Sequence, residues 1–161
     1  LSKYFINKID YLNPINYYID NVLIVKENNE GSNLTGNTGF ELEEINEFCK
    51  NNNFQRVKPE NINEVILINI LKNCKNLVVS WGTAHYKSIP YLNTSYETIN
   101  ILIKNKGSYI GQYKKYLKIY NNYLSSNKSN KRSDVLHFFY DSPKTTFHVI
   151  NNLNEVNIQN V

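Results

Sequence analysis

The densest cluster of hydrogen-bonding and titratable side chains follows an apolar run in the middle of the chain, in the sequence Trp81-Gly82-Thr83-Ala84-His85-Tyr86-Lys87-Ser88. Gly82 lets the backbone pass close to a ligand, and Thr83 and Ser88 supply hydroxyls. Backbone amides that begin a helical turn in this loop can donate hydrogen bonds to a phosphate, helped by the positive end of the turn. The pattern therefore predicts a site for a phosphorylated ligand.

Several enzyme classes are excluded by the patterns that the sequence lacks. It contains no Gly-rich Walker loop, no Gly-x-Ser-x-Gly elbow and no Asp-x-Asp pair that would hold a divalent cation on a diphosphate. Cys49 and Cys74 form no Cys-x-x-Cys pair, and no histidine stands at metal-ligand spacing from them. We expect no bound metal and no cofactor, and interpret both cysteines as buried free thiols, which favours intracellular folding.

Length and composition indicate one globular domain. The chain has 161 residues, of which 41% are hydrophobic and 20% charged, and no apolar run approaches the roughly 18 residues of a membrane-spanning helix. It contains no Met, so we expect a piece of a longer protein, with a missing N-terminal domain as its partner. We divide it into a lead-in helix or linker (1–20), a core (21–126), and a basic linker with C-terminal strands that pack on the core (127–161).

The elements that must position this loop alternate between strands and helices. Short apolar runs predict core strands over residues 21–26, 54–58, 76–81 and 98–103. Helical spacing of apolar residues predicts helices over 41–49 and 62–71, which begin at capping boxes formed by Thr38 with Glu41 and by Asn61 with Glu64. An amphipathic helix is predicted over 108–124, and two late strands over 135–140 and 146–150.

This alternation predicts an α/β, Rossmann-like parallel sheet with helices on both faces and a C-terminal amphipathic helix. In such sheets a ligand lies beyond the carboxyl ends of the strands, where the connection order reverses. If the strand order is 2-1-3-4, that crevice lies between the first and third strands. The loop from Lys26 through Asn28 to Gly39 would form one wall, and the loop that begins at Trp81 would form the other.

The order of these elements resembles glycosyltransferase family 61 over about the first hundred residues. The resemblance is carried by the runs Asn53-Phe54-Gln55-Arg56-Val57-Lys58-Pro59-Glu60 and Asn73-Cys74-Lys75-Asn76-Leu77-Val78-Val79-Ser80-Trp81-Gly82. The family resembles other metal-independent transferases with two Rossmann-like halves (the GT-B type), in which the C-terminal half holds a nucleotide sugar. The chain departs from the family pattern at Lys26-Glu27, where an Arg is expected, and in the loop from Gly82 to Ser88, where the family has a His-Gly-Ala-Gly-Leu-Thr-Asn type sequence.

The resemblance implies transfer of a sugar from a nucleotide sugar to a glycan or protein acceptor, with amides and cations neutralising the leaving diphosphate. Lys26 and Lys87 would then be the phosphate cations, and the amides from Gly82 to Ala84 the cradle. Asn28, Thr83 and Ser88 would be further ligand-binding residues, and His85 a hydrogen-bonding partner or proton acceptor.

Each candidate also has a purely structural interpretation. His85 fits an ordinary loop histidine, Lys87 fits a solvated surface charge, and Trp81 fits a core side chain better than a platform for a base. His137 and His148 lie in strand-like runs and are interpreted as structural.

A second function class follows from the distribution of charge. No acidic residue lies between Glu97 and Asp134, whereas eight basic residues do: Lys104, Lys106, Lys114, Lys115, Lys118, Lys128, Lys131 and Arg132. The alternative is thus a non-catalytic interaction domain whose basic Tyr/Lys helix binds nucleic acid or an acidic protein. Its tyrosines and lysines fall on opposite helix faces, however, which favours packing of the tyrosines on the core or on the missing half.

Overall fold

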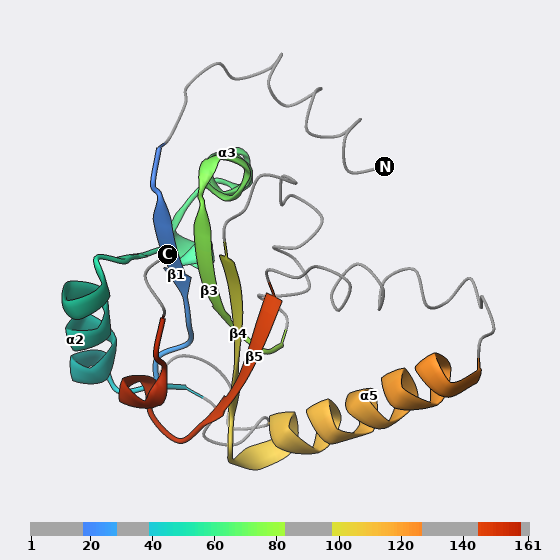
Figure 1. Ribbon diagram of the computed structural model, residues 1–161. Coiled ribbons are helices and arrows are strands. Elements are labelled where there is room, and N and C mark those ends of the chain that lie inside the picture. The colour runs from blue at the N-terminus through green and yellow to red at the C-terminus, as the bar shows by residue number, and fades with distance from the viewer. Residues whose placement is uncertain (1–17, 29–38, 83–97, 127–144, 159–161) are drawn as a thin grey trace.

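The computed structural model describes residues 18–28, 39–82, 98–126 and 145–158 (Figure 1). Five strands form one parallel sheet in the order β2-β1-β3-β4-β5. The predicted α/β Rossmann-like fold is confirmed, and the predicted order 2-1-3-4 is extended by β5 beside β4. Residues 1–17 of the expected lead-in over 1–20, and the expected strand over 135–140, lie outside the described residues.

The central strands are buried on both faces, which explains their nearly continuous apolar sequences. They are β1 (Asn21–Ile24), β3 (Asn76–Ser80) and β4 (Thr98–Lys104). The edge strands are β2 (Gln55–Arg56) and β5 (Thr145–Ile150), and β2 is shorter than predicted. The Val57 N–H still donates to the Leu23 carbonyl at 2.9 Å, and a short 3-10 helix over Pro59–Asn61 then leaves the sheet.

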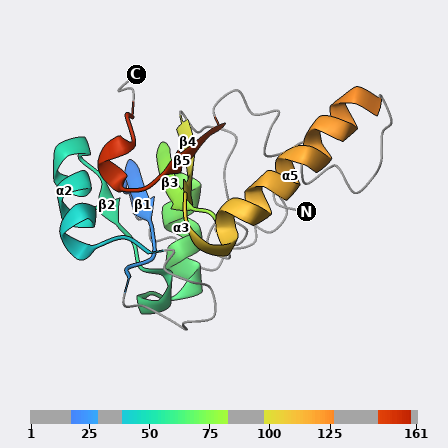
Figure 2. The same ribbon diagram turned by 90° about the horizontal axis from the view of Figure 1, so that it is seen from below.

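Two apolar cores lie on the two faces of the sheet. Helix α2 (Leu42–Asn52) and the 3-10 helix over Leu153–Glu155 contribute Ile45, Phe48 and Leu153 to the core on one face. Helix α3 (Glu64–Asn73) and the first half of α5 (Gly107–Ser126) cover the other face. Figures 1 and 2 show α2 and α5 on opposite sides of the sheet, and the far end of α5 extends away from it.

Both predicted N-caps are wrong, Thr38 by three residues and Asn61 by two. The N-cap of α2 is Glu41, whose backbone N–H donates to Glu44 Oε2 at 3.2 Å. The N-cap of α3 is Asn63, whose Oδ1 accepts from the Val65 N–H at 2.8 Å. Asn61 cannot cap α3 because it belongs to the preceding 3-10 helix.

The tyrosine face of α5 packs on the sheet, as the packing interpretation predicted. Trp81 is 3% exposed, and its ring centroid lies 5.5 Å from that of Tyr113, 5.3 Å from that of Tyr116 and 6.2 Å from that of Phe147. Trp81 is therefore a core residue. The predicted stripe continues to Tyr120 and Tyr123, whose side chains lie outside the described part.

A row of polar side chains crosses the sheet on the face that α2 covers. His148 Nε2 lies 2.8 Å from Asn100 Oδ1, and Asn100 Nδ2 donates to Thr98 Oγ1 at 3.4 Å. Thr98 Oγ1 donates to Asn76 Oδ1 at 2.8 Å, and Asn76 Nδ2 donates to Asn21 Oδ1 at 2.7 Å. Asn21 Nδ2 in turn donates to the backbone carbonyl of residue 53 at 3.0 Å. These bonds tie β5 to the segment that precedes β2.

Candidate functional site

The connection order reverses at β1, which lies between β2 and β3. Because β1 and β3 are adjacent and parallel, with Ile24 beside Val79, both strands end at the same edge of the sheet. The segments that follow them, which include Lys26 and Asn28 on one side and Gly82 on the other, therefore leave from this edge. It is the place where open parallel sheets bind ligands.

The segment after β1 is held against the residues that precede α2. The Phe40 N–H donates to the Lys26 carbonyl at 2.9 Å, and the Asn28 N–H donates to the Phe40 carbonyl at 3.0 Å. Asn28 Nδ2 also donates to Glu41 Oε1. Asn28 Oδ1 is buried and has no hydrogen-bond partner among the described residues, so it remains a candidate ligand contact. Lys26 is partly buried at the same edge.

Glu27 also lies at this edge and is paired with two cations, one in β2 and one just after it. Its Oε2 lies 2.9 Å from Arg56 Nη1 and 3.3 Å from Lys58 Nζ. The hydrogen bonds from Arg56 and Lys58 lower the pKa of Glu27, so its carboxyl is ionised at neutral pH. The ion pairs fasten the end of β1 to β2 and leave Glu27 unsuited to proton transfer.

Lys104 is a buried cation of this edge and was not among the predicted site residues. It is the last residue of β4 and is only 8% exposed, whereas its sequence context suggested a surface charge. Its ammonium donates to the Gly39 carbonyl and lies 4.6 Å from the centroid of the Phe40 ring. Burial lowers the pKa of Lys104, and the carboxylates of Glu44 and Glu41 counteract that shift. The sequence signal that could have indicated its burial is that this lysine ends an otherwise largely apolar strand.

Ser80 is a second missed residue. It ends β3 with 8% exposure, beside Leu102 of β4, and alternation places it on the face of Val78, which α2 covers. Its Oγ has no hydrogen-bond partner among the described residues. A buried hydroxyl without a partner costs free energy, so this oxygen is poised to bind a ligand or a water. Lys104 lies two residues beyond Leu102 on the same side of β4.

Gly82 needs a backbone conformation that glycine adopts readily, with φ at 129°. A Cβ atom there would stand 2.9 Å from the hydroxyl of Tyr109, in the first turn of α5. The remaining predicted residues of this loop, Thr83, Ala84, His85, Lys87 and Ser88, lie outside the described residues, and their roles stay predictions.

Burial disfavours the thiolate form of both cysteines. Cys74 is 2% exposed, and burial raises the pKa of its thiol to about 12. Cys49 is partly buried, and burial raises the pKa of its thiol as well. Both are free cysteines, as predicted, although only Cys74 is fully buried.

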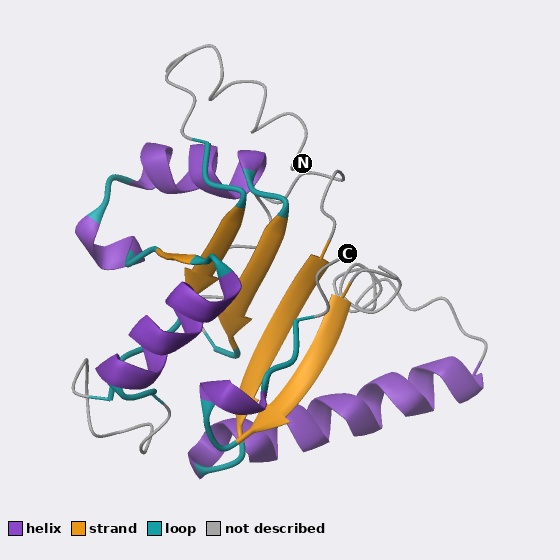
Figure 3. Cartoon of the chain, turned by 60° about the vertical axis from the view of Figure 1, so that its left-hand side comes forward, coloured by secondary structure: helices purple, strands orange, loops and turns teal. Residues whose placement is uncertain are grey.

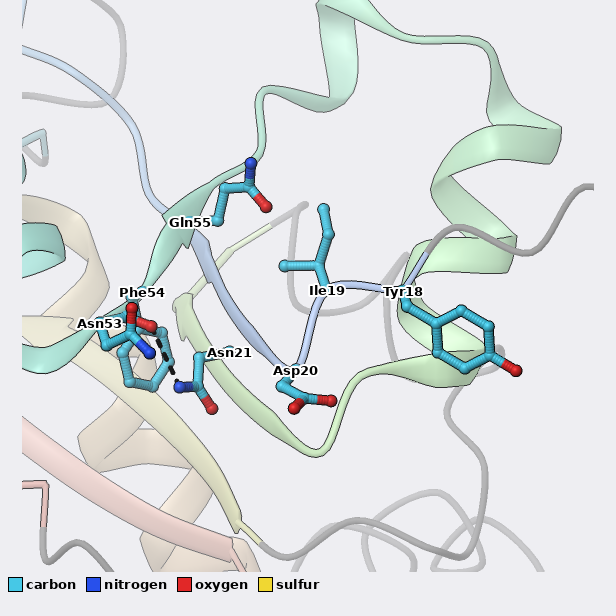
Figure 4. A pocket seen from close by; sticks show the side chains of 7 residues that line it. All are labelled: Tyr18, Ile19, Asp20, Asn21, Asn53, Phe54 and Gln55. Atoms are coloured by element: carbon cyan, nitrogen blue, oxygen red, sulfur yellow. Dashed lines mark hydrogen bonds between the residues drawn. The ribbon is translucent and has the colours of Figure 1, made fainter.

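An open pocket of about 370 Å³ lies at the opposite, amino edge of the sheet and is lined by Tyr18, Ile19, Asp20, Asn21, Asn53, Phe54 and Gln55 (Figure 4). The Asp20 carboxylate lies 3.3 Å from Lys75 Nζ, and the Tyr18 side chain is 74% exposed. Because β1 separates this pocket from Lys26 and Asn28, it is no part of the candidate site.

Within the described residues, no group of three or more His, Cys, Asp or Glu side chains is arranged to hold a metal ion. None of the helices in the described segments has both the length and the apolar character needed to cross a bilayer. Comparisons with protein families, curated proteins and solved structures find no match to the chain.

Proposed function

We propose that this domain binds a nucleotide sugar at the carboxyl edge of β1 and β3, as the donor-binding domain of a metal-independent glycosyltransferase. The single observation that carries the proposal is the buried Lys104 ammonium against Gly39 and Phe40, just before α2, at the carboxyl edge of the sheet in which the strand order reverses. A buried cation at this position supplies the charge that a diphosphate requires.

The surrounding groups fit the same ligand. The first amides of α2 carry the positive end of the helix dipole. Ser80 Oγ can donate a hydrogen bond to a phosphate oxygen, whereas Asn28 Oδ1 can accept one from a ribose or sugar hydroxyl. In sugar transfer these groups would stabilise the charge that develops on the leaving diphosphate. His85 is proposed as the proton acceptor, and a glycan or protein is the proposed acceptor substrate.

A thermal-shift series with UDP-, GDP- and CMP-sugars tests the proposal. A ligand that binds only the native state raises its stability by RT ln(1 + [L]/Kd), so one nucleotide series should raise the melting temperature, also in EDTA. Lys104→Met should abolish the shift while keeping the fold, because an aliphatic chain of similar length replaces a buried charge. Lys75→Met, at the amino edge, is the matched control and should keep the full shift.

Two results would contradict this function. The first is the absence of a shift with every nucleotide sugar. The second is binding that disappears in EDTA and returns with manganese, because a metal and not the Lys104 edge would then neutralise the diphosphate.

The second candidate function is binding of an anionic macromolecule by α5. Lys114, Lys115 and Lys118 are exposed, and α5 contains no acidic residue. The packing of Tyr113 and Tyr116 on Trp81 limits this surface to charge contacts, without stacking of bases on these two rings.

A further inference from the structure

The buried Lys104 ammonium lies close to two carboxylates, those of Glu41 and Glu44. The ammonium contacts Gly39 and the ring of Phe40, and Glu41 follows Phe40 directly as the N-cap of α2. Glu44 is the third residue of that helix. Both negative charges raise the pKa of Lys104, against the larger and opposite effect of burial. The cation that would receive a phosphate is therefore already close to two negative charges.

Both carboxylates are held in these positions by hydrogen bonds. Glu44 Oε2 accepts from the backbone N–H of Glu41 at 3.2 Å, and its Oε1 accepts from that of Leu153 at 2.6 Å. Glu41 Oε1 accepts from Asn28 Nδ2. A carboxylate that moved away from an anion at Lys104 would lose these bonds, so both negative charges stay close to the bound anion.

Among the described residues, the charges that act on the Lys104 ammonium balance its own. They are the exposed cation Lys106 and the carboxylates of Glu41 and Glu44. The place is also shielded from water, since Lys104 and Ser80 are each 8% exposed. The cost of taking an ion out of water rises with the square of its charge, and its repulsion by fixed carboxylates rises with that charge. A phosphate with one negative charge is therefore favoured here over a phosphate with two.

We propose that Lys104 binds an inner phosphate, one that is bonded through oxygen on two sides and carries a single negative charge. The inference rests on the proposed function and deepens it, since the α-phosphate of a nucleotide sugar is such a group. The phosphate of a nucleoside monophosphate is not, because it carries two charges above its second pKa of about 6. Glu41 and Glu44 are then specificity-determining residues that disfavour a terminal phosphate. The outer phosphate, on which charge develops during sugar transfer, lies away from these two carboxylates.

Calorimetric titration tests the inference with UDP-glucose, GDP-mannose and CMP-sialic acid, with UMP, GMP and CMP, and with the methyl esters of the three monophosphates. A methyl ester adds one methyl group to the phosphate and removes one negative charge. For the nucleotide whose sugar derivative binds, the ester should bind at least about fivefold more tightly than the monophosphate at about pH 8. A site governed only by attraction to a cation would give the reverse order.

A double variant tests the two carboxylates. Glu41→Gln with Glu44→Gln should tighten binding of the monophosphate more than that of its ester, so the preference should decrease to about twofold or less. The matched control is Glu43→Gln with Glu47→Gln, which removes the same charge from exposed positions of α2 and should keep the preference of the parent. Because Glu44→Gln also removes a hydrogen bond at the start of α2, Glu41→Gln alone is measured as well and should show part of the decrease.

The outcomes separate this inference from the function on which it rests. Failure of all three nucleotide sugars to bind would overturn both. A monophosphate that binds as tightly as its ester, or an ester that does not bind although the nucleotide sugar does, would overturn the inference and keep the proposed function. The same preference in the two double variants would also overturn it, since Glu41 and Glu44 would then have no part in the selection.

Discussion

Gly39 shows how closely the segment before α2 approaches β1. An added Cβ atom there would stand 2.6 Å from the carbonyl carbon of Glu27 and 2.7 Å from the amide nitrogen of Asn28. Both are backbone atoms, so no side-chain rotation relieves the contact. The same glycine supplies the carbonyl that Lys104 binds.

Gly39→Ala is therefore expected to lower the free energy of unfolding by about 1 to 3 kcal/mol, the cost of overpacking a tight site. The matched control is Gly111→Ala, because a Cβ at residue 111 of α5 meets nothing within 4 Å. That change should raise the free energy of unfolding by about 0.5 to 1 kcal/mol, since alanine favours a helix more than glycine does. Urea unfolding measures both, and equal effects would contradict the packing around Gly39.

Sequence patterns predicted some residues of the edge and missed others. The core role of Trp81 follows from its position after a buried strand and is confirmed. The ligand contact of Gly82 stays a prediction, although its φ of 129° is one that glycine adopts readily. Lys104 and Ser80 were missed because single-residue hydropathy treats a lysine or serine at a strand end as exposed. Lys104 is covered by Gly39 and Phe40, in the segment before α2, which is distant from it in sequence.

Helix α5 is held on the sheet by its first half only. Tyr109, Ile110, Tyr113 and Tyr116 pack against the core, whereas Lys114, Lys115 and Lys118 face solvent. The helix then continues beyond the sheet (Figures 2 and 3). Packing and charge are thus separated on one helix and can be changed independently.

Tyr116→Ala should cost about 2 to 3 kcal/mol of unfolding free energy, below the full value for a buried aromatic because the ring is only partly covered. Replacing Lys114, Lys115 and Lys118 together by Gln should change stability by less than about 0.5 kcal/mol, because exposed charges contribute little. Chemical denaturation distinguishes the two variants.

The triple Lys variant also tests the second candidate function. If α5 bound nucleic acid, this variant would lose a salt-sensitive affinity that the parent has, since each neutralised phosphate adds about 0.9 to the slope of log affinity against log salt on duplex DNA. Such a loss, with no response of the parent to nucleotide sugars, would favour the interaction domain over the transferase.

Strand β5 introduces a pH dependence through His148. Burial lowers the pKa of its imidazole below the ordinary value of 6.5. The unfolded chain then binds this proton at a higher pH than the native protein does, so stability is full above about pH 6.5 and decreases as the pH falls toward the native pKa. In that window the free energy of unfolding should decrease by up to about 1.4 kcal/mol per pH unit.

His148→Gln is the control for this slope. The difference in unfolding free energy between the parent and this variant should depend on pH between 7.5 and 5.5. The lowered pKa of Glu27 acts at more acidic pH, below about 4.5, so its contribution falls outside this range. A pH-independent difference would show that His148 titrates normally in the native state.

Helix boundaries were predicted less well than strands for a physical reason. Several consecutive polar residues precede both α2 and α3, and Glu41 and Asn63 compete with Thr38 and Asn61 as caps. The three-dimensional path of the chain decides between them, because the bridge between Glu27 and Phe40 holds the residue just before Glu41 against the end of β1, and the 3-10 helix over Pro59–Asn61 contains Asn61. Strand positions follow instead from apolar runs that only a doubly covered sheet can bury.

The parallel sheet, and the reversal of the strand connection order at β1, were predicted from the alternation of strands and helices along the sequence. The position of β5 did not, because its sequence contains both polar and apolar residues and its partner strand is far away in the chain. Its place beside β4 depends on burial of Ile150 in one core and packing of Phe147 against the other. The position of β5 therefore depends on tertiary packing, which the local sequence of the strand does not reveal.

The donor and acceptor of every hydrogen bond in the polar row across the sheet are fixed by the bond at one end of the row. The carbonyl of residue 53 can only accept, so Asn21 must present its amide nitrogen there and its oxygen to Asn76. The Thr98 hydroxyl therefore donates to the Asn76 oxygen and accepts from the Asn100 amide nitrogen. The Asn100 side-chain oxygen is then left facing the imidazole of His148. Because Asn100 Oδ1 can only accept, neutral His148 must carry its ring hydrogen on Nε2, and its Nδ1 is unprotonated. A carbonyl beside one edge strand thus dictates the tautomer of a histidine on the other, which its nitrogen chemical shifts would reveal.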